Sequence, residues 1–454
     1  MRSHDRGMST GECANHEPEQ CSIVEPWNVP TKYRNANLQA LRLRGALVPY
    51  LYQASYQAHK HGRWFITPLY FFWPELDGAY ETANPRSSPD AKYELEYLLG
   101  DDLLVAPVVK PANGTDGLAR LSLWVPPGLW VGWEGGRVLK GDSQQGSNYP
   151  IAVDLKELPI FARVGAVIPT APVHPGATIG MTRSPNKELV WVVALANGGP
   201  SAGMGTIYED DGATNKYHTK KEYAITTAKY TVTNDETEPG MRGSNTQTTR
   251  HLEAAGNVTI SFTVSMVGSF DSLPALRGTT IRLMNTAPPS FVTANGKAIP
   301  YTRFGGKGTW TFDSKDTAVI IELEPIPVTE SIQVLATTSG FFGEGLGFQL
   351  GRAAAAKAVL DESRSVPGSQ EGQASSEAYL SRAASYGSML NFLAADSPAF
   401  LNAVKSYEKI YNGAIDELQN LLQETSANNS ASFSRVVRAL ALLETATSTR
   451  ATSV

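Results

Sequence analysis

From about residue 102 to residue 350, the chain contains short apolar runs separated by turns rich in Gly, Pro and Asn. Helical periodicity is almost absent from this stretch. Many short strands at such a spacing are typical of antiparallel β-sandwiches rather than of a parallel sheet. We expect strands at residues 103–109, 121–125, 189–196, 206–209, 222–232, 258–264, 280–284, 317–323 and 331–336. The stretch is therefore predicted to form β-sandwich domains.

Turn residues refine this organisation. Asn295-Gly296 lies between two apolar runs, and this dipeptide is favoured in a tight type I′ hairpin. Residues 171–187 are rich in Pro, Gly and Ser, which indicates a break in regular structure. We place the boundary between two sandwiches in that segment.

Helical patterns flank the predicted strands. Residues 38–61 have apolar positions at helical spacing, so we expect one long helix, kinked at Pro49 and capped by Gly62. The aromatic run at residues 64–73 is then predicted to be a buried connection against a larger body. Beyond residue 340 we expect helices at residues 351–363, 377–394, 399–425 and 433–445, with a flexible link at 365–376.

Length and composition limit the class of protein. The 454 residues suffice for two or three domains. The chain is 42% hydrophobic and 18% charged, with a net charge of −5, which argues against a nucleic-acid partner. The chain contains no run of about 18 or more apolar residues that could span a bilayer, and its N-terminus lacks the apolar region of a secretory signal. We expect no membrane partner.

Two cysteines, Cys13 and Cys21, lie eight positions apart in a polar segment. A disulfide and two unpaired thiols are equally good predictions for them. A metal site is disfavoured because only His4 and His16 lie nearby. Three glycosylation sequons, compatible with a secretory protein, begin at Asn113, Asn257 and Asn428.

Five segments, in order along the chain, resemble glycoside hydrolase family 31. They are Met1-Arg2-Ser3-His4 with Glu25-Pro26-Trp27, residues 41–59 with Leu-Val-Pro-Tyr-Leu-Tyr, residues 99–108, residues 158–169, and Tyr208-Glu209-Asp210-Asp211-Gly212. The resemblance covers residues 1 to about 340. It implies a mainly β chain, made of the end of a (β/α)8 barrel, two antiparallel β-sandwiches and an α-helical tail.

We expect four segments along the chain. Residues 1–75 would end the catalytic barrel, 76–175 would form the proximal sandwich, 176–340 the distal sandwich, and 341–454 a helical extension. A (β/α)8 barrel closes only with all eight strands. We therefore expect residues 1–75 to be poorly anchored, with the apolar face of the 38–61 helix uncovered.

The resemblance also implies an activity, the hydrolysis of α-linked glucosides with retention of configuration. Retention requires two carboxyl groups about 5 to 5.5 Å apart. The resemblance places the nucleophile and the acid/base upstream of this chain, so we expect no catalytic residue within it and no cofactor. We predict a truncated product that is inactive alone, whose intact form belongs to the secretory pathway, with an α-linked oligosaccharide as its substrate.

Arg2 and His4 are the predicted substrate-binding residues. By resemblance, His4 hydrogen-bonds a sugar hydroxyl, and a neutral imidazole can both donate and accept. Arg2 either holds an active-site carboxylate or closes the barrel through a salt bridge. We expect Asp5 and Glu25 to be rim structure.

Other acidic and aromatic residues are expected to be structural. We expect turn and capping roles for Asp101, Asp102, Asp210 and Asp211. Core or interdomain packing is expected for most of the tryptophans Trp27, Trp64, Trp73, Trp124, Trp130 and Trp133.

Two alternatives remain open. One is a non-catalytic carbohydrate-binding or partner-binding protein, since sandwiches host many functions. The other is a chain that pairs with a separate polypeptide carrying the rest of the barrel.

Overall fold

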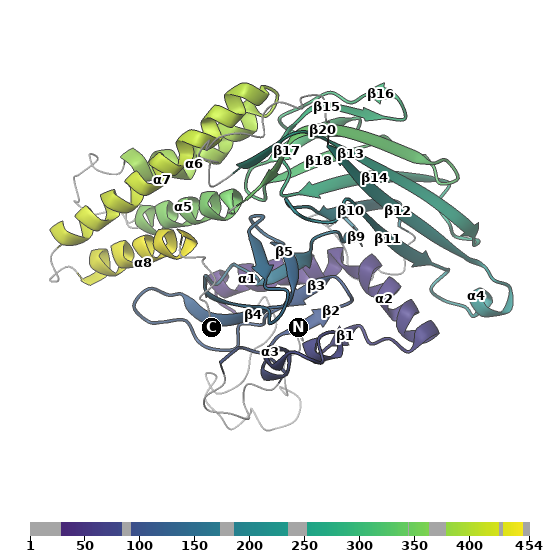
Figure 1. Ribbon diagram of the computed structural model, residues 1–454, viewed down its shortest axis with the longest axis horizontal. Coiled ribbons are helices and arrows are strands. Elements are labelled where there is room, and N and C mark those ends of the chain that lie inside the picture. Colours follow the sequence, from purple (N-terminus) through teal and green to yellow (C-terminus); the bar gives the residue numbers. More distant parts are fainter. Residues whose placement is uncertain are drawn as a thin grey trace.

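The computed structural model describes residues 29–83, 92–172, 186–234, 252–343, 345–362, 378–425 and 430–447. Two β-sandwiches lie against each other, and a group of four helices packs at one end of them (Figure 1). The predicted mainly β architecture with a helical C-terminal region is confirmed.

The first sandwich packs a six-stranded sheet against a two-stranded one, and all of its strand pairs are antiparallel. In spatial order the larger sheet contains β1 (Ile66–Thr67), β2 (Tyr97–Leu99), β3 (Leu103–Val105), β8 (Ile160–Arg163), β5 (Gly128–Gly132) and β6 (Val138–Gly141). The smaller contains β4 (Ala119–Val125) and β7 (Ser147–Val153). Trp124 and Trp130 are fully buried in its core, as predicted.

The second sandwich has two larger sheets. One contains β17 (Thr309–Asp313), β18 (Ala318–Glu322), β14 (Leu276–Met284), β10 (Glu188–Ala194) and β9 (Val167–Thr170), with β19 (Ile326–Pro327) beside β14. The other contains β11 (Ala202–Glu209), β12 (Tyr223–Asn234), β13 (Leu252–Ser269), β20 (Ile332–Phe342), β15 (Pro289–Ala294) and β16 (Lys297–Ala298). A short helix, α4 (Lys216–Thr219), lies between β11 and β12.

Turn residues predict the pairing of strands that are neighbours in the chain, but not the pairing of distant strands. Asn295 and Gly296 have φ values of 46° and 77°, and they join β15 to β16 in the predicted hairpin. The pair β10/β14 is parallel, which an antiparallel sandwich would not contain. Parallel neighbours need a long connection, and here strands β11 to β13 of the other sheet supply it.

The prediction of one helix at residues 38–61 is wrong in its continuity. The structure has α1 (Thr31–Ala46) and α2 (Val48–His61), separated at Leu47. Pro49 lies in the first turn of α2, where its missing N–H costs nothing, whereas the interior of a single helix would lose a hydrogen bond. Gly62 ends α2 in the left-handed conformation, φ 68°, as predicted.

The expected exposure of this helix is also wrong for its second half. Leu47 and Tyr50 are 4% and 6% exposed, within a core that both sandwiches share. The Tyr50 hydroxyl donates to the Leu99 carbonyl at 2.9 Å and accepts from the Asp102 amide at 3.1 Å. The helix is therefore anchored by the sandwiches themselves.

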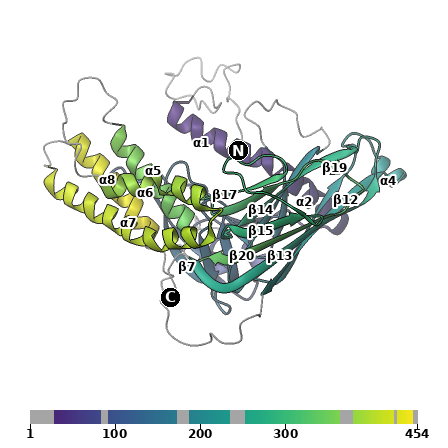
Figure 2. The ribbon, with the colours of Figure 1, turned by 90° about the horizontal axis from the view of Figure 1, so that it is seen from above.

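The four predicted tail helices are present as α5 (Leu346–Asp361), α6 (Ala378–Leu393), α7 (Ser397–Glu424) and α8 (Ser430–Thr447). Asp396 caps α7 by accepting from the Ala399 amide at 3.1 Å, and a proline occupies the first turn. Seen from above, the helices lie together at one end of the strands (Figure 2). No described helix has the length and apolar character needed to cross a bilayer.

The tail continues the core of the second sandwich. Phe400 of α7 is 1% exposed and packs edge-on against Phe312 of β17, with ring centroids 5.2 Å apart. Ser314 follows β17, and its amide and hydroxyl bind the Asn391 side chain and the Gly387 carbonyl of α6 at 2.9 Å each. Sandwich and tail therefore share one hydrophobic cluster.

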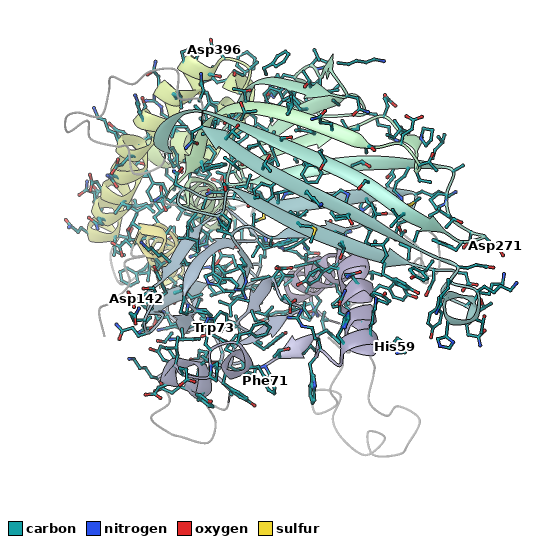
Figure 3. All side chains as sticks on the ribbon, turned by 45° about the vertical axis from the view of Figure 1, so that its right-hand side comes forward. His59, Phe71, Trp73, Asp142, Asp271 and Asp396 are labelled. Atoms are coloured by element: carbon teal, nitrogen blue, oxygen red, sulfur yellow. The ribbon has the colours of Figure 1, made fainter. Side chains whose placement is uncertain are left out.

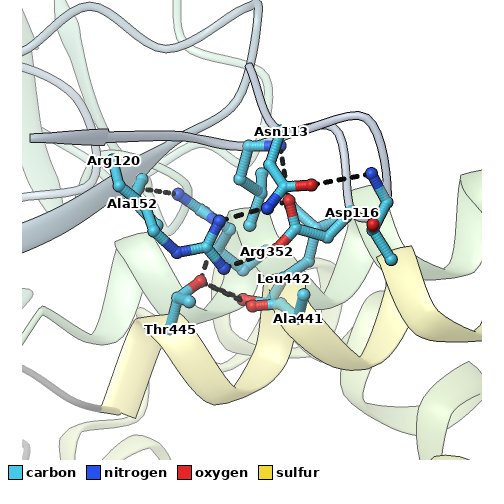
Figure 4. A network of polar contacts seen from close by, with 10 residues as sticks. Asn113, Asp116, Arg120, Ala152, Arg352, Ala441, Leu442 and Thr445 are labelled. Atoms are coloured by element: carbon cyan, nitrogen blue, oxygen red, sulfur yellow. Dashed lines mark hydrogen bonds and ion pairs between the residues drawn. The ribbon is translucent and has the colours of Figure 1, made fainter.

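Arg352 ties the tail to the first sandwich. Its side chain is 1% exposed and donates to the Ala152 carbonyl at 2.6 Å, to Glu157 at 2.6 Å and to Thr445 of α8 at 3.1 Å (Figure 4). Arg438 of α8 pairs with Asp154 at 2.8 Å. These contacts fix the tail against the loop between β7 and β8.

Candidate functional site

The predicted binding residues Arg2 and His4 lie outside the described residues. The same is true of Asp5, Glu25, Trp27, Cys13 and Cys21. Their roles stay predictions. The described residues that follow them in the chain include an exposed apolar surface and several acidic side chains.

Next to α2, an apolar surface is formed by β1, a 3-10 turn η2 (Leu69–Phe71) and α3 (Asp77–Glu81). We call it the aromatic surface; its members Trp64, Phe65, Ile66, Phe71 and Tyr80 are 73%, 39%, 51%, 60% and 51% exposed. Figure 3 places Phe71 at the edge of the molecule. The expectation of a buried connection at residues 64–73 is wrong for the four members in that run, although Leu69 is fully buried. Large exposed apolar patches are typical of surfaces that contact another protein or domain.

Asp210 connects α2 to the second sandwich. Its carboxylate accepts from the Tyr52 hydroxyl at 2.6 Å, the Tyr208 hydroxyl at 2.9 Å and the Gly212 amide at 2.9 Å. The Tyr56 and Tyr208 rings stack with centroids 4.0 Å apart. The predicted turn role of Asp210 is confirmed, and its contact with α2 was not predicted because it spans 158 positions.

Asp101 and Asp102 share the turn between β2 and β3. Gly100 precedes them with φ 63°, and a Cβ there would lie 2.1 Å from the Tyr50 hydroxyl. Burial raises the pKa of Asp102 to about 6, although the guanidinium of Arg163 opposes the shift. Asp101 is half exposed and pairs with Arg63 at 3.2 Å. Two neighbouring carboxyl groups on one turn do not face each other across a sugar, so they form no glycosidase pair.

Glu96 is a buried acidic group of the first sandwich. It is 1% exposed and accepts from the Trp124 amide at 2.7 Å, and its second oxygen has no partner among the described residues. Burial raises the pKa of this carboxyl well above its ordinary value. Its place inside the core excludes contact with a substrate, so its effect is on stability.

We expect Glu96→Gln to stabilise the protein at neutral pH. The folded state keeps the Glu96 proton after the unfolded state has lost it, so stability falls as pH rises from the ordinary carboxyl pKa towards the raised one. A neutral amide removes this loss and retains an acceptor for Trp124. Urea unfolding at pH 4.5 and 7.5 should show a gain that grows with pH. The exposed Glu81→Gln controls for a lost charge, and an equal gain at both pH values would contradict the prediction.

One cavity is lined by carboxylates that already have partners. A cavity between the first sandwich and α5 includes Glu134, Asp154 and Glu157 in its wall. Glu134 accepts from Gln39, while Asp154 and Glu157 are paired with arginines of the tail. None of these three carboxylates is unengaged, and the described ranges contain no group of three His, Cys, Asp or Glu suited to a metal.

Part of this chain matches a known family of protein domains. Residues 62–168 match the Glycosyl hydrolase family 31 C-terminal domain, so this part of the chain is a domain of a glycoside-hydrolase family. The predicted resemblance to the C-terminal portion of family 31 is confirmed over these residues.

The relatives are considerably longer than this chain. Alpha-glucosidase 2 of Bacillus thermoamyloliquefaciens is 29% identical over 216 residues, which are 47% of this chain and 24% of that protein. Neutral alpha-glucosidase C of Mus musculus is 31% identical over 196 residues, 42% of this chain and 19% of the relative. This chain thus spans about a quarter or less of the curated relatives it matches.

A solved structure shows the same fold. The Flavobacterium johnsoniae GH31 dextranase FjDex31A, complexed with glucose, superposes with a TM-score of 0.52 at 18% identity. The match covers 69% of this chain and 34% of the dextranase.

Proposed function

We propose that this chain supplies the end of the catalytic barrel and both sandwiches to a retaining hydrolase of α-linked glucosides. The match of residues 62–168 to the family 31 C-terminal domain carries the proposal, and two relatives named as alpha-glucosidases give the substrate class. The nucleophile and the acid/base would lie outside these residues.

The role of the sandwiches follows from the contacts of α2. The sandwiches bury Leu47 and Tyr50, and the Asp210 carboxylate accepts a hydrogen bond from Tyr52. The sandwiches therefore fix the helix that the resemblance places last in the barrel. The aromatic surface lies beside this helix and would meet the rest of the barrel. On this proposal Arg2 and His4 lie at the barrel rim and bind the substrate sugar.

Hydrolysis of a chromogenic α-glucoside by the purified chain tests where the catalytic carboxylates lie. Assays at pH 4.5 and 7, beside His4→Ala and a blank, should show no turnover above the blank. Turnover that falls in His4→Ala would mean that carboxylates of this chain perform the chemistry, and this part of the proposal would be abandoned.

Complementation tests the positive part of the proposal. The chain would be co-expressed with the Bacillus thermoamyloliquefaciens alpha-glucosidase 2 truncated before the region that this chain matches. We expect α-glucosidase activity only when both are present. A stable complex without activity would count against a shared barrel. Retention of the chain on immobilised glucan, without any complex, would favour the alternative of a carbohydrate-binding module.

The aromatic surface should make the isolated chain self-associate. We expect the double variant Trp64→Ser/Phe71→Ser to be monomeric at concentrations where the unaltered chain forms larger species, because burying apolar area drives association. Sedimentation velocity measures the difference. The matched control is Phe304→Ser/Phe392→Ser, at sites 93% and 68% exposed elsewhere on the molecule. If both double variants reduce association equally, the aromatic surface has no special role.

A further inference from the structure

A cavity of about 230 Å³ separates the first sandwich from the helical tail. Its walls come from the turn after β5, the end of β7 with the loop that follows, and α5. Ile151, Val153, Phe161 and Phe348 make much of the wall apolar. The volume lies below the roughly 300–1,000 Å³ of sites for drug-sized ligands. The space suits a smaller molecule.

A buried cation in this wall has no partner among the described residues. Arg137 is 7% exposed, and its Nε and Nη2 nitrogens make no hydrogen bond within the described part of the chain. Its guanidinium lies 5.5 Å from the centre of the Phe348 ring. Burial and the nearby Arg352 lower the pKa of Arg137 to about 10. Buried guanidinium groups are normally paired, so this one needs an anion.

The acidic residues of the wall do not supply that anion. Glu157 is ion-paired with Arg352 at 2.6 Å, and Asp154 with Arg438 at 2.8 Å. Glu134 accepts a hydrogen bond from Gln39. No ion pair of Arg137 is present among the described residues.

A glycine in α5 gives independent support. Gly351 lines the cavity in the interior of this helix, and a Cβ added there would meet no atom within 4 Å. Gly347, one turn earlier, is different, because its Cβ would lie 2.4 Å from the Lys315 carbonyl oxygen. Close packing thus explains Gly347 but not Gly351, and a helix-interior glycine is unfavourable relative to alanine. What Gly351 does provide is open space in the cavity.

We propose that this cavity binds a small carboxylic acid with an apolar body, whose carboxylate pairs with Arg137. A guanidinium offers parallel donors that match the two oxygens of a carboxylate. The apolar wall would bury the body of the ligand. Because α5 and the first sandwich share the cavity, the bound acid would also strengthen the attachment of the tail. The inference does not depend on the proposed glycosidase activity.

Binding of 4-fluorobenzoate to the full chain, followed by ¹⁹F NMR, tests the proposal. We expect saturable broadening that benzoate and hexanoate reverse and that benzamide, the neutral equivalent of benzoate, does not. Glucose should not compete, because it brings no charge to Arg137. Failure of all three acids to bind at millimolar concentration, or equal competition by benzamide, would overturn the proposal.

Three variants locate the site. Gly351→Phe fills the cavity without altering Arg137 and should abolish binding, and Arg137→Gln should weaken it by roughly tenfold to a hundredfold. The matched control is Arg382→Gln, at an exposed position of α6, which should bind as the unaltered chain does. Circular dichroism establishes that each variant is folded. If Arg137→Gln does not fold, Gly351→Phe decides alone, and unchanged binding by it would overturn the proposal.

Discussion

Phe400→Ala is expected to lower the free energy of unfolding by about 3–5 kcal/mol, the usual cost of removing a buried phenylalanine ring. The Phe400 side chain is 1% exposed. It contacts Phe312 and Phe342 of the second sandwich, at centroid distances of 5.2 and 6.3 Å. The substitution therefore opens a cavity between sandwich and tail. Urea unfolding, followed by circular dichroism, measures the change.

The control for Phe400→Ala is Phe392→Ala, the same substitution on α6 at a position 68% exposed. Exposed sites of this kind change stability by less than about 0.5 kcal/mol. We expect one unfolding transition in the unaltered chain, because sandwich and tail share a hydrophobic cluster. A separate early transition of the helices, insensitive to Phe400→Ala, would show that the tail is an independent unit.

The second large effect concerns the buried pair Arg277–Glu209. Two hydrogen bonds of 2.9 Å join the groups, whose side chains are 7% and 4% exposed, and Arg277 also donates to the Asn186 carbonyl at 2.8 Å. Glu209→Leu leaves the guanidinium buried without its counterion. We expect a loss of about 3–5 kcal/mol in the free energy of unfolding, measured in urea.

Two further variants separate pairing from burial. Arg277→Met combined with Glu209→Leu should recover most of the loss, because an apolar pair of similar volume avoids the desolvation penalty. Lys307→Ala, which breaks an exposed pair of 3.2 Å with Glu188, should cost less than about 1 kcal/mol. If the double variant is no more stable than Glu209→Leu, unpaired charge is not the cause of the loss.

Local chemistry predicted most of the elements. The Asn295-Gly296 hairpin, the Gly62 cap and the four tail helices follow from turn residues and periodicity. The break at Leu47 was missed because a proline pattern alone does not distinguish a kink from two helices. The parallel pair β10/β14 was missed because its strands lie about 90 positions apart, and no local signal fixes such a neighbour.

The functional sites show the same limit of prediction from sequence. Motifs indicated the family, and the family gave roles to Arg2 and His4, which lie outside the described residues. The cavity at Arg137 was not foreseen, because its wall combines residues near positions 39, 135, 155, 315 and 350. Only the folded chain shows that no described carboxylate pairs with Arg137.

The shared core of sandwich and tail has a consequence for biosynthesis. Strand β20 ends at Phe342, and α5 begins at Leu346. The ribosome therefore completes every described strand before it makes the four tail helices, α5 to α8. Phe312 and Phe342 cannot be covered until α7, which contains Phe400, has emerged. At about 5–20 residues per second, the end of the sandwich remains open for several seconds. During that interval the nascent chain would be a substrate for chaperones.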